Sequence, residues 1–392
     1  MAAIEALVTP QVLSWARQQA GYTVGEVASW LHRKVEEITA WERGELRPTL
    51  AQARKLAHRY RRSLGDLYLD QPPSEPAPPA DFRSGPWAAD RRISSQVSFE
   101  VRRIHAMRDA AVELGELNEV TLRAFPVQAS SEEHPEEVAR RLRDALKVSL
   151  ETQTGWGTPD AAWKGWRSAV EHLGALVFVV RDLDPRALGG FSLAAEVAPV
   201  IAINGKDVHH RKLFTLMHEL VHLALRQDGV CDLREDGDIS PASIEVFCNA
   251  VAAAILMPAE TITAHPLVHG RDRHSAWSDQ DLGSVASFFR VSPQAALRRM
   301  VSLNLTSWDL YRRWCAEHPF TPQPRDPDRK GGAFYNTYIH DTGMPYLALV
   351  FDAFHARRIH VTNVCDYLGH KVSTVKGIEK HYIDQVLSRR TR

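Results

Sequence analysis

KLFTLMHELVHLALRQDG, residues 212–229, contains two histidines four residues apart with a glutamate between them. An α-helix stacks residues i and i+4, so His218 and His222 can direct both imidazoles at one metal ion while Glu219 lies beside it. In a chain with 18 histidines, the pattern HExxH would also arise by chance in about one such sequence in twenty. The motif therefore favours a zinc-binding helix, and two ordinary surface histidines are the alternative.

A catalytic zinc ion needs three protein ligands and an open position for water. The third candidate is Glu245, which opens the apolar segment IEVFCNAVAAAILMP, residues 244–258. A lone carboxylate heading an alanine-rich helix needs a partner, which favours a ligand over a solvated acid stabilised by the helix dipole. Asn249, one turn later, can hydrogen-bond a ligand and steady it. The alternative ligands are acids of the intervening polar loop, namely Asp228, Asp232, Glu235, Asp236 and Asp238.

The composition limits the class of protein. With 392 residues, 44% of them hydrophobic, the chain can bury about two or three cores without help from a metal. Lysine plus arginine and aspartate plus glutamate each total 48, which excludes a strongly basic nucleic-acid binder. The 4 cysteines form no CxxC pair, which argues against a disulfide framework or a cysteine zinc cluster. We see neither a signal peptide nor a membrane-spanning run and expect a cytoplasmic protein without a membrane partner.

Two proline-rich or polar stretches predict the domain boundaries. QPPSEPAPPADFRSGP, residues 71–86, favours an extended linker, and TPQPRDPDRKGG, residues 321–332, marks a second boundary. We therefore predict four parts: an N-terminal domain at 1–70, a linker at 71–90, a central domain at 91–320 and a small helical C-terminal domain at 333–392.

The central part has signals for both helices and strands. Proline and acids in the first turn predict a helix over 135–146, and further helices are expected over 91–122 and 160–172. LGALVFVV at 173–180 and PVIAIN at 199–204 are typical of buried strands. The predicted fold class is α+β and mostly helical, with a small sheet in a zincin-like central domain.

Residues 1–70 contain short amphipathic segments joined by tight turns. Thr23 can cap one helix, a basic turn at 32–34 follows, and the next helix is expected over 35–41. This spacing predicts a helix-turn-helix, and WERGELRPT at 41–49 resembles the xenobiotic-response-element type of DNA-binding domain. The candidate DNA contacts are Arg33, Lys34, Thr39, Arg43 and Arg47.

The charge of this N-terminal segment weighs against DNA. Glu36 and Glu37 fall on the expected recognition helix, where phosphate would repel them, and 10 Lys/Arg face 8 Asp/Glu over residues 1–70. A module that docks a protein or forms a dimer is the alternative.

The combination of PVIAIN, KLFTLMHELVHLAL and IEVFCNAVAAAILMP resembles the ImmA/IrrE family of zinc metallo-endopeptidases, fused to a repressor-type helix-turn-helix and a proline-rich linker with DFR at 81–83. The resemblance implies one zinc ion per chain, ligated by His218, His222 and Glu245, with Glu219 as general base. It also implies that the strand at 199–204 lines the cleft and can pair with substrate. The sequence departs from the family at Cys248, where alanine is usual, and at Val251, where phenylalanine is usual.

The expected function is site-specific cleavage of a repressor-like regulator encoded nearby, in a stress response or in the control of mobile elements. The alternative is a DNA-binding regulator or antitoxin-like module that uses the peptidase fold as a sensor. An oxyanion-stabilising donor is also expected, and four residues are candidates: His209, His210, Arg211 and Tyr335. The helical tail at 333–392 suggests packing or substrate recruitment, with a second DNA-contacting unit as the alternative. A dimer is the oligomeric state considered.

Overall fold

The structure, a computed structural model, describes residues 4–74, 91–181, 183, 188–226, 229–231, 244–318 and 334–390. Most of the predicted linker, the DFR motif, the loop acids named above and the polar stretch at 321–332 lie outside the described residues. The chain forms two compact units, residues 1–105 with 182–187 and residues 106–181 with 188–392. Helix α5 (Arg91–Leu117) runs through the boundary between them. Within the described residues, no helix is long and apolar enough to cross a membrane.

The first unit begins with a bundle of short helices. They are α1 (Pro10–Gln19), α2 (Val24–Leu31), α3 (Val35–Arg43), α4 (Leu50–Arg59) and the 3-10 helix η1 (Gly65–Tyr68). Thr23 caps α2 in a capping box with Glu26, as the sequence predicts. His32 ends α2 in the left-handed conformation, with φ 53°, and α3 starts three residues later. Inside the bundle, Arg17 Nε lies 2.6 Å from Glu42 Oε1 and ties α1 to α3.

The second unit is built on a four-stranded sheet with the order β1-β3-β2-β4. The strands are β1 (Leu176–Val180), β2 (Gly190–Leu193), β3 (Val200–Asn204) and β4 (Gly229–Cys231). β3 pairs in parallel with β1 and antiparallel with β2, so both of its edges are occupied. The expectation that the strand at 199–204 pairs with substrate is therefore wrong, because β2, a strand of only four residues, fills that edge.

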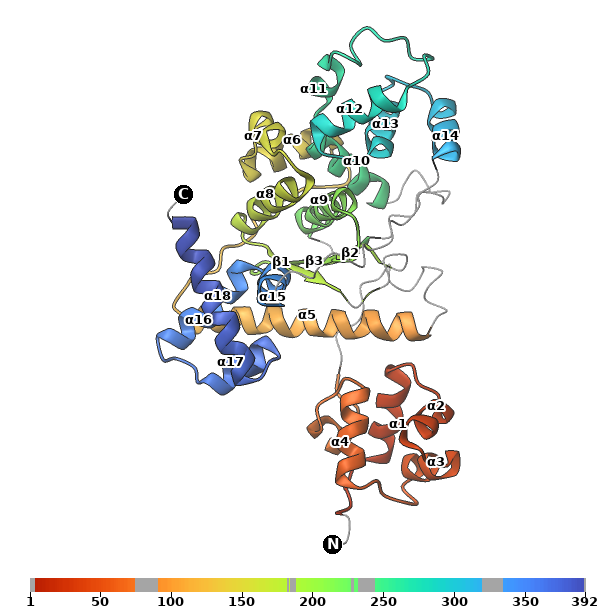
Figure 1. The fold of residues 1–392 in the computed structure, drawn as a ribbon, viewed down its shortest axis with the longest axis vertical. Helices are drawn as coiled ribbons and strands as arrows, with labels where there is room; N and C mark the ends of the chain where they lie inside the picture. The colour runs from red at the N-terminus through yellow and green to blue at the C-terminus, as the bar shows by residue number, and fades with distance from the viewer. Residues whose placement is uncertain are drawn as a thin grey trace. The chain divides into compact units, whose positions relative to one another are not determined.

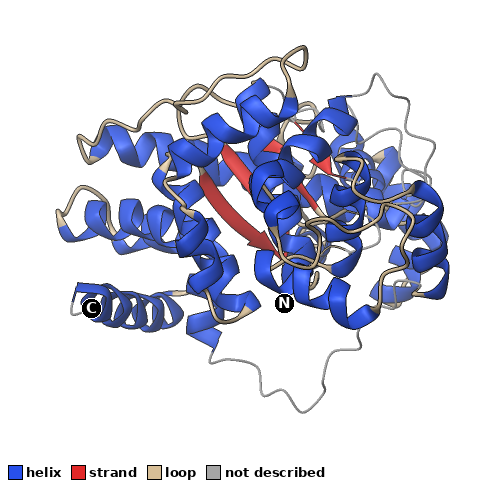
Figure 2. Ribbon diagram, turned by 90° about the horizontal axis from the view of Figure 1, so that it is seen from above, coloured by secondary structure: helices blue, strands red, loops and turns tan. Residues whose placement is uncertain are grey.

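One face of the sheet supports the helices of the main core. Val177, Val179, Ile201 and Ile203 point to this side and join one large cluster of buried side chains. Figure 1 shows α8, α9 and α10 on one side of the strands, and Figure 2, seen from above, shows the strands lying among helices. The helices are α6 (Pro135–Leu146), α7 (Leu150–Gly155), α8 (Pro159–His172), α9 (His209–Leu225), α10 (Ile244–Leu256), α11 (Ala259–Ala264), α12 (Asp279–Phe289), α13 (Pro293–Ser302) and α14 (Trp308–Glu317).

The C-terminal helices pack on the opposite face, where Figure 1 shows α15 beneath the strands. They are α15 (Phe334–Thr342), α16 (Met344–His355), α17 (Val361–Leu368) and α18 (Val372–Arg390). The rings of Phe178 on β1 and Tyr346 on α16 meet edge to face at 5.6 Å, and Trp163 Nε1 lies 3.1 Å from His340 Nε2. Gly343 joins α15 to α16 with φ +85°, where an added Cβ would lie 2.7 Å from Arg167 Nη2.

These contacts place residues 334–390 in the same compact unit as the sheet, rather than in a tethered module. The fold is thus mostly helical with a small sheet, and the predicted α+β class is confirmed.

Candidate metal centre

Helix α9 carries the HELVH motif through the middle of the core. Its buried residues extend around the whole helix and number 12 of its 17 residues, so α9 is covered on every side. His218 is 1% exposed, Glu219 0% and His222 1%. The alternative of two surface histidines is thus ruled out by their burial, and buried imidazoles need polar partners.

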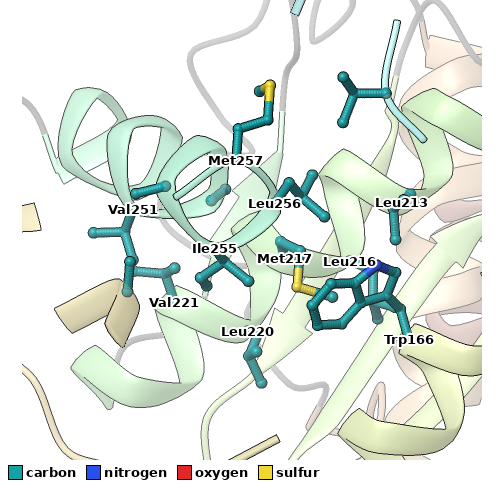
Figure 3. Close-up of a cluster of buried hydrophobic side chains, with 14 of the residues drawn as sticks. Trp166, Leu213, Leu216, Met217, Leu220, Val221, Val251, Ile255, Leu256 and Met257 are labelled. Atoms are coloured by element: carbon teal, nitrogen blue, oxygen red, sulfur yellow. The ribbon is translucent and has the colours of Figure 1, made fainter. Parts of the chain in front are cut away.

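Helix α10 packs along α9 and brings the third donor to this pair. Figure 3 shows the contact, with Met217, Leu220 and Val221 of α9 lying near Val251, Ile255 and Leu256 of α10. All six side chains are fully buried. The apolar face of α10 therefore fixes the helix against α9, and Glu245 in its first turn reaches the two histidines.

Three donor atoms meet at one point. His218 Nε2 lies 3.0 Å from Glu245 Oε2, His222 Nε2 lies 3.3 Å from Glu245 Oε1, and the two Nε2 atoms are 3.1 Å apart. Ligands in a tetrahedral zinc site with bonds of about 2.0–2.1 Å are separated by about 3.4 Å. Two imidazole nitrogens and a carboxylate oxygen, converging at nearly this spacing, fit zinc. Within the described residues, this is the one group of three or more such side chains close enough to hold a metal ion.

The electrostatics of Glu245 agree with a ligand role. Burial alone would raise its pKa, but the hydrogen bonds and the charge interactions with His218 and His222 together outweigh burial and lower the pKa to about 2. The carboxyl group is therefore ionised at neutral pH and available as a metal ligand.

The two histidines differ in what holds their second ring nitrogen. His218 Nδ1 lies 3.0 Å from Asn249 Oδ1, as the sequence predicts for a residue that steadies a ligand. That contact fixes Nδ1 as the protonated atom and leaves the Nε2 lone pair for a metal. His222 Nδ1 is buried and has no hydrogen-bond partner among the described residues.

The four candidate oxyanion donors lie elsewhere. His209 and Arg211 lie in the first turn of α9. His209 is 3.6 Å from Asp160, and Arg211 is 3.7 Å from Asp207. His210 lies between them, and the seven to nine residues separating all three from His218 correspond to about 10–14 Å along the helix. Tyr335 stacks on His381, with ring centroids 4.7 Å apart, in the C-terminal helices. None of the four is therefore assigned an oxyanion role.

The five candidate DNA contacts all lie on or after the turn between α2 and α3. All three arginines among them face carboxylates: Arg33 is 3.6 Å from Glu37, Arg43 is 3.9 Å from Glu45 and Arg47 is 4.0 Å from Glu5. Lys34 is the exposed N-cap residue of α3, and Thr39 Oγ1 donates to Val35 O at 2.9 Å. These exposed ion pairs are weak and can rearrange.

The three converging donors on two packed helices are typical of a metallopeptidase site. Comparisons with known proteins point to the same class of protein. Residues 170–301 match the model of a peptidase family described as the IrrE N-terminal-like domain. Over 67 residues the chain is 45% identical to the radiation response metalloprotease IrrE of Deinococcus deserti. That alignment covers 16% of this chain and 24% of the relative, so the chain spans about a quarter of that protein's length. No solved structure matches the chain.

The family match contains all the residues of the candidate centre. The segment 170–301 includes β1, β2, β3, α9 and α10. It is similar to an IrrE-type metallopeptidase domain, which supports a protease role and a metal cofactor for this chain.

Proposed function

We propose that the chain is a zinc-dependent endopeptidase of the ImmA/IrrE type. The observation that carries the proposal is the meeting of His218, His222 and Glu245 at 3.0–3.3 Å, with the buried Glu219 beside them on the same helix. A structural zinc site would normally be closed by four protein ligands, whereas three ligands and an adjacent carboxylate suit hydrolysis.

Each residue then has a chemical role. Zinc, when bound, polarises the scissile carbonyl and lowers the pKa of water to about 7. Glu219 takes a proton from the attacking water and delivers it to the leaving amine. Asn249 holds the ring of His218 in the orientation that ligation needs. Glu219 is fully buried, and exclusion of bulk water strengthens electrostatic interactions at such a site.

The substrate we propose is a folded regulatory protein, repressor-like and encoded nearby, cut at one site in the cytoplasm during a stress response or in the control of mobile elements. The relative's printed name, a radiation response metalloprotease, supports the stress setting. A protease free in the cytoplasm must not digest its surroundings, so specificity has to come from outside the small metal site. The helical bundle at the N-terminus supplies a docking surface that raises the local concentration of substrate.

The experiment is to incubate the zinc-loaded chain with purified products of the neighbouring genes and to map any cut by mass spectrometry. We expect one clean cut in one partner and slow cleavage of unfolded casein. Glu219→Gln, which keeps the shape of the side chain, should retain zinc and lose at least about 100-fold in cleavage rate. Full activity in the Gln variant, or rapid degradation of casein by the wild-type chain, would contradict the proposal.

DNA binding is the second candidate, favoured by the position of Arg33 and Lys34 at the turn between α2 and α3. In this reading the chain regulates transcription and the peptidase fold acts as a sensor. Gel-shift titration with the promoter of its own gene at moderate salt tests it. A specific complex weakened in Arg33→Ala and Lys34→Ala supports the regulator, and the absence of any complex rejects it.

A further inference from the structure

Three successive carbonyl groups at the end of α10 are bound by side chains from other helices. Ile255 O accepts from Arg143 Nη1 at 2.6 Å, Leu256 O from Gln153 Nε2 at 2.9 Å, and Met257 O from Arg299 Nε at 3.0 Å. The last carbonyls of a helix have no partner within it. Pro258 follows directly, so neither a continued helix nor a glycine cap can supply one.

The three donors are themselves held in place. Arg143 also donates to Val148 O at 3.0 Å and to Gln153 Oε1 at 2.9 Å, and Gln153 donates to Phe289 O at 3.0 Å. Arg299 pairs with Glu136 at 2.7 Å. Gln153 is 0% and Arg299 4% exposed. Arg143 belongs to α6, Gln153 to α7 and Arg299 to α13. Side chains from three neighbouring helices therefore clamp the C-terminal end of α10. The two guanidinium groups also complement the negative end of the helix dipole.

The opposite end of α10 carries the metal-centre residues. Glu245 lies in its first turn and Asn249 in its second, and the residues immediately before Ile244 lie outside the described part of the chain. Glu245 and Leu256 are eleven residues apart, which is about 16 Å along a helix. A helix of this length is stiff, so its displacement or rotation at the clamped end moves Glu245 and Asn249 as well.

We infer that Arg143, Gln153 and Arg299 are positioning residues for the metal centre. They fix the axial position and rotation of α10, and thereby the point at which Glu245 and Asn249 meet His218. The apolar packing of α10 on α9 holds the two helices together sideways, and the hydrogen-bonded clamp on three carbonyls adds a directional constraint on axial shift and rotation. The inference rests on the proposed metal centre.

The test compares Arg143→Met and Gln153→Leu with the wild-type chain. Both substitutions roughly preserve volume and remove the donors. Arg140→Met is the matched control, because Arg140 lies on the same helix, is 71% exposed and makes only a surface pair with Asp144 at 3.5 Å among the described residues. Arg143→Lys keeps a charged donor and serves as the conservative variant if Arg143→Met fails to fold.

The first measurement is hydrogen exchange of the metal-free full-length chain in peptides covering 244–252, where amides from Cys248 onward are hydrogen-bonded within the helix. We expect exchange about tenfold faster in the two variants, unchanged exchange in Arg140→Met and an intermediate value in Arg143→Lys. Faster exchange confined to residues 253–258 would show that the clamp acts only locally and would overturn the inference.

The second measurement is zinc affinity, determined by competition with a coloured chelator. A loss of about 10- to 100-fold is expected for the variants, with no change in the control. A lower thermal stability with unchanged zinc affinity would reduce the three residues to structural ones. If the wild-type chain binds no zinc, the proposed function fails, and the exchange measurement still decides whether the clamp positions the start of α10.

Discussion

At the scale of single residues, Asn249 distinguishes the two histidines of the centre. Its carbonyl oxygen accepts from His218 Nδ1, whereas His222 Nδ1 has no partner among the described residues. We predict that Asn249→Ala lowers zinc affinity by about 10- to 100-fold. Asn249→Asp keeps an acceptor at the same position and should retain most of the affinity. Equal zinc affinity in the Ala variant and the wild-type chain, measured by chelator competition, would show that the contact does not orient the ligand.

Asp207, just before α9, gives the fold a pH dependence. Its side chain is 3% exposed, and Arg211 Nε lies 3.7 Å from Oδ1. Burial raises the pKa to about 6, although Arg211 and Lys212 favour the ionised form. The pKa of Asp207 in the folded chain lies above the unfolded value of 3.8, so the folded state binds the carboxyl proton more tightly. The free energy of unfolding therefore decreases as the pH rises from about 4 to 6.

Asp207→Asn should remove that loss. We predict that the Asn variant gains stability relative to the wild-type chain between pH 4 and 6.5, by about 1–3 kcal/mol in total, and that the difference is constant above. Thermal unfolding of both proteins across this range measures it. A difference that does not change with pH would mean that Asp207 titrates at its ordinary value when folded.

At the scale of elements, the pairing of α9 with α10 holds the centre together. Ile255 is fully buried in this contact, so Ile255→Ala should cost about 2–4 kcal/mol. Ile383, which is 39% exposed on α18, provides the matched control, and Ile383→Ala should change stability by about 0.5 kcal/mol or less. Denaturant unfolding compares the two variants. Similar effects at both sites would argue against close packing of α9 on α10.

Elements with strong local signals were predictable from the sequence. The helix expected at 135–146 has those bounds in the structure, because proline and two glutamates in its first turn are local features. β2 has four residues, all buried, and shows no alternation, so it was not predicted. The central position of β3 depends on β2 and could not be deduced either.

In the metal centre too, features within one helix were predictable from the sequence, whereas contacts between helices were harder to predict. The spacing of His218 and His222 is a property of one helix, whereas the position of Glu245 depends on how α10 packs against α9. Nothing in the sequence marked Arg143 or Gln153, because each meets α10 from more than 100 positions away along the chain. Glu245 and Asn249 could be proposed from the sequence because they are polar residues in an otherwise apolar helix, whereas the clamp on the far end of α10 could not.

At the scale of the whole molecule, the two ends of the chain should have different roles. The C-terminal helices cover Phe178 and bind Arg181 through Asp341 at 2.7 Å. Removing residues 334–392 exposes this face of the sheet, so we predict a melting temperature lower by about 5–10 °C or an insoluble chain. A truncated chain as stable as the full-length protein would show that these contacts contribute little.

Removal of residues 1–74 should have the opposite result. We predict that this deletion leaves zinc stoichiometry unchanged, because the proposed ligands all lie in the second unit, but slows cleavage of the true partner by about 100-fold or more through loss of local concentration. Zinc analysis and cleavage assays on the same preparation measure both. Unchanged cleavage would show that the N-terminal bundle does not recruit the substrate.

The most direct test of the metal centre is a calorimetric titration of zinc into the metal-free, full-length chain, with His218→Ala as the comparison. We predict saturation at one zinc ion per wild-type chain and loss of that site in the variant, because one of three converging donors is missing. Absence of saturable binding in the wild-type chain, or the same stoichiometry and affinity in His218→Ala, would contradict a zinc site at His218, His222 and Glu245.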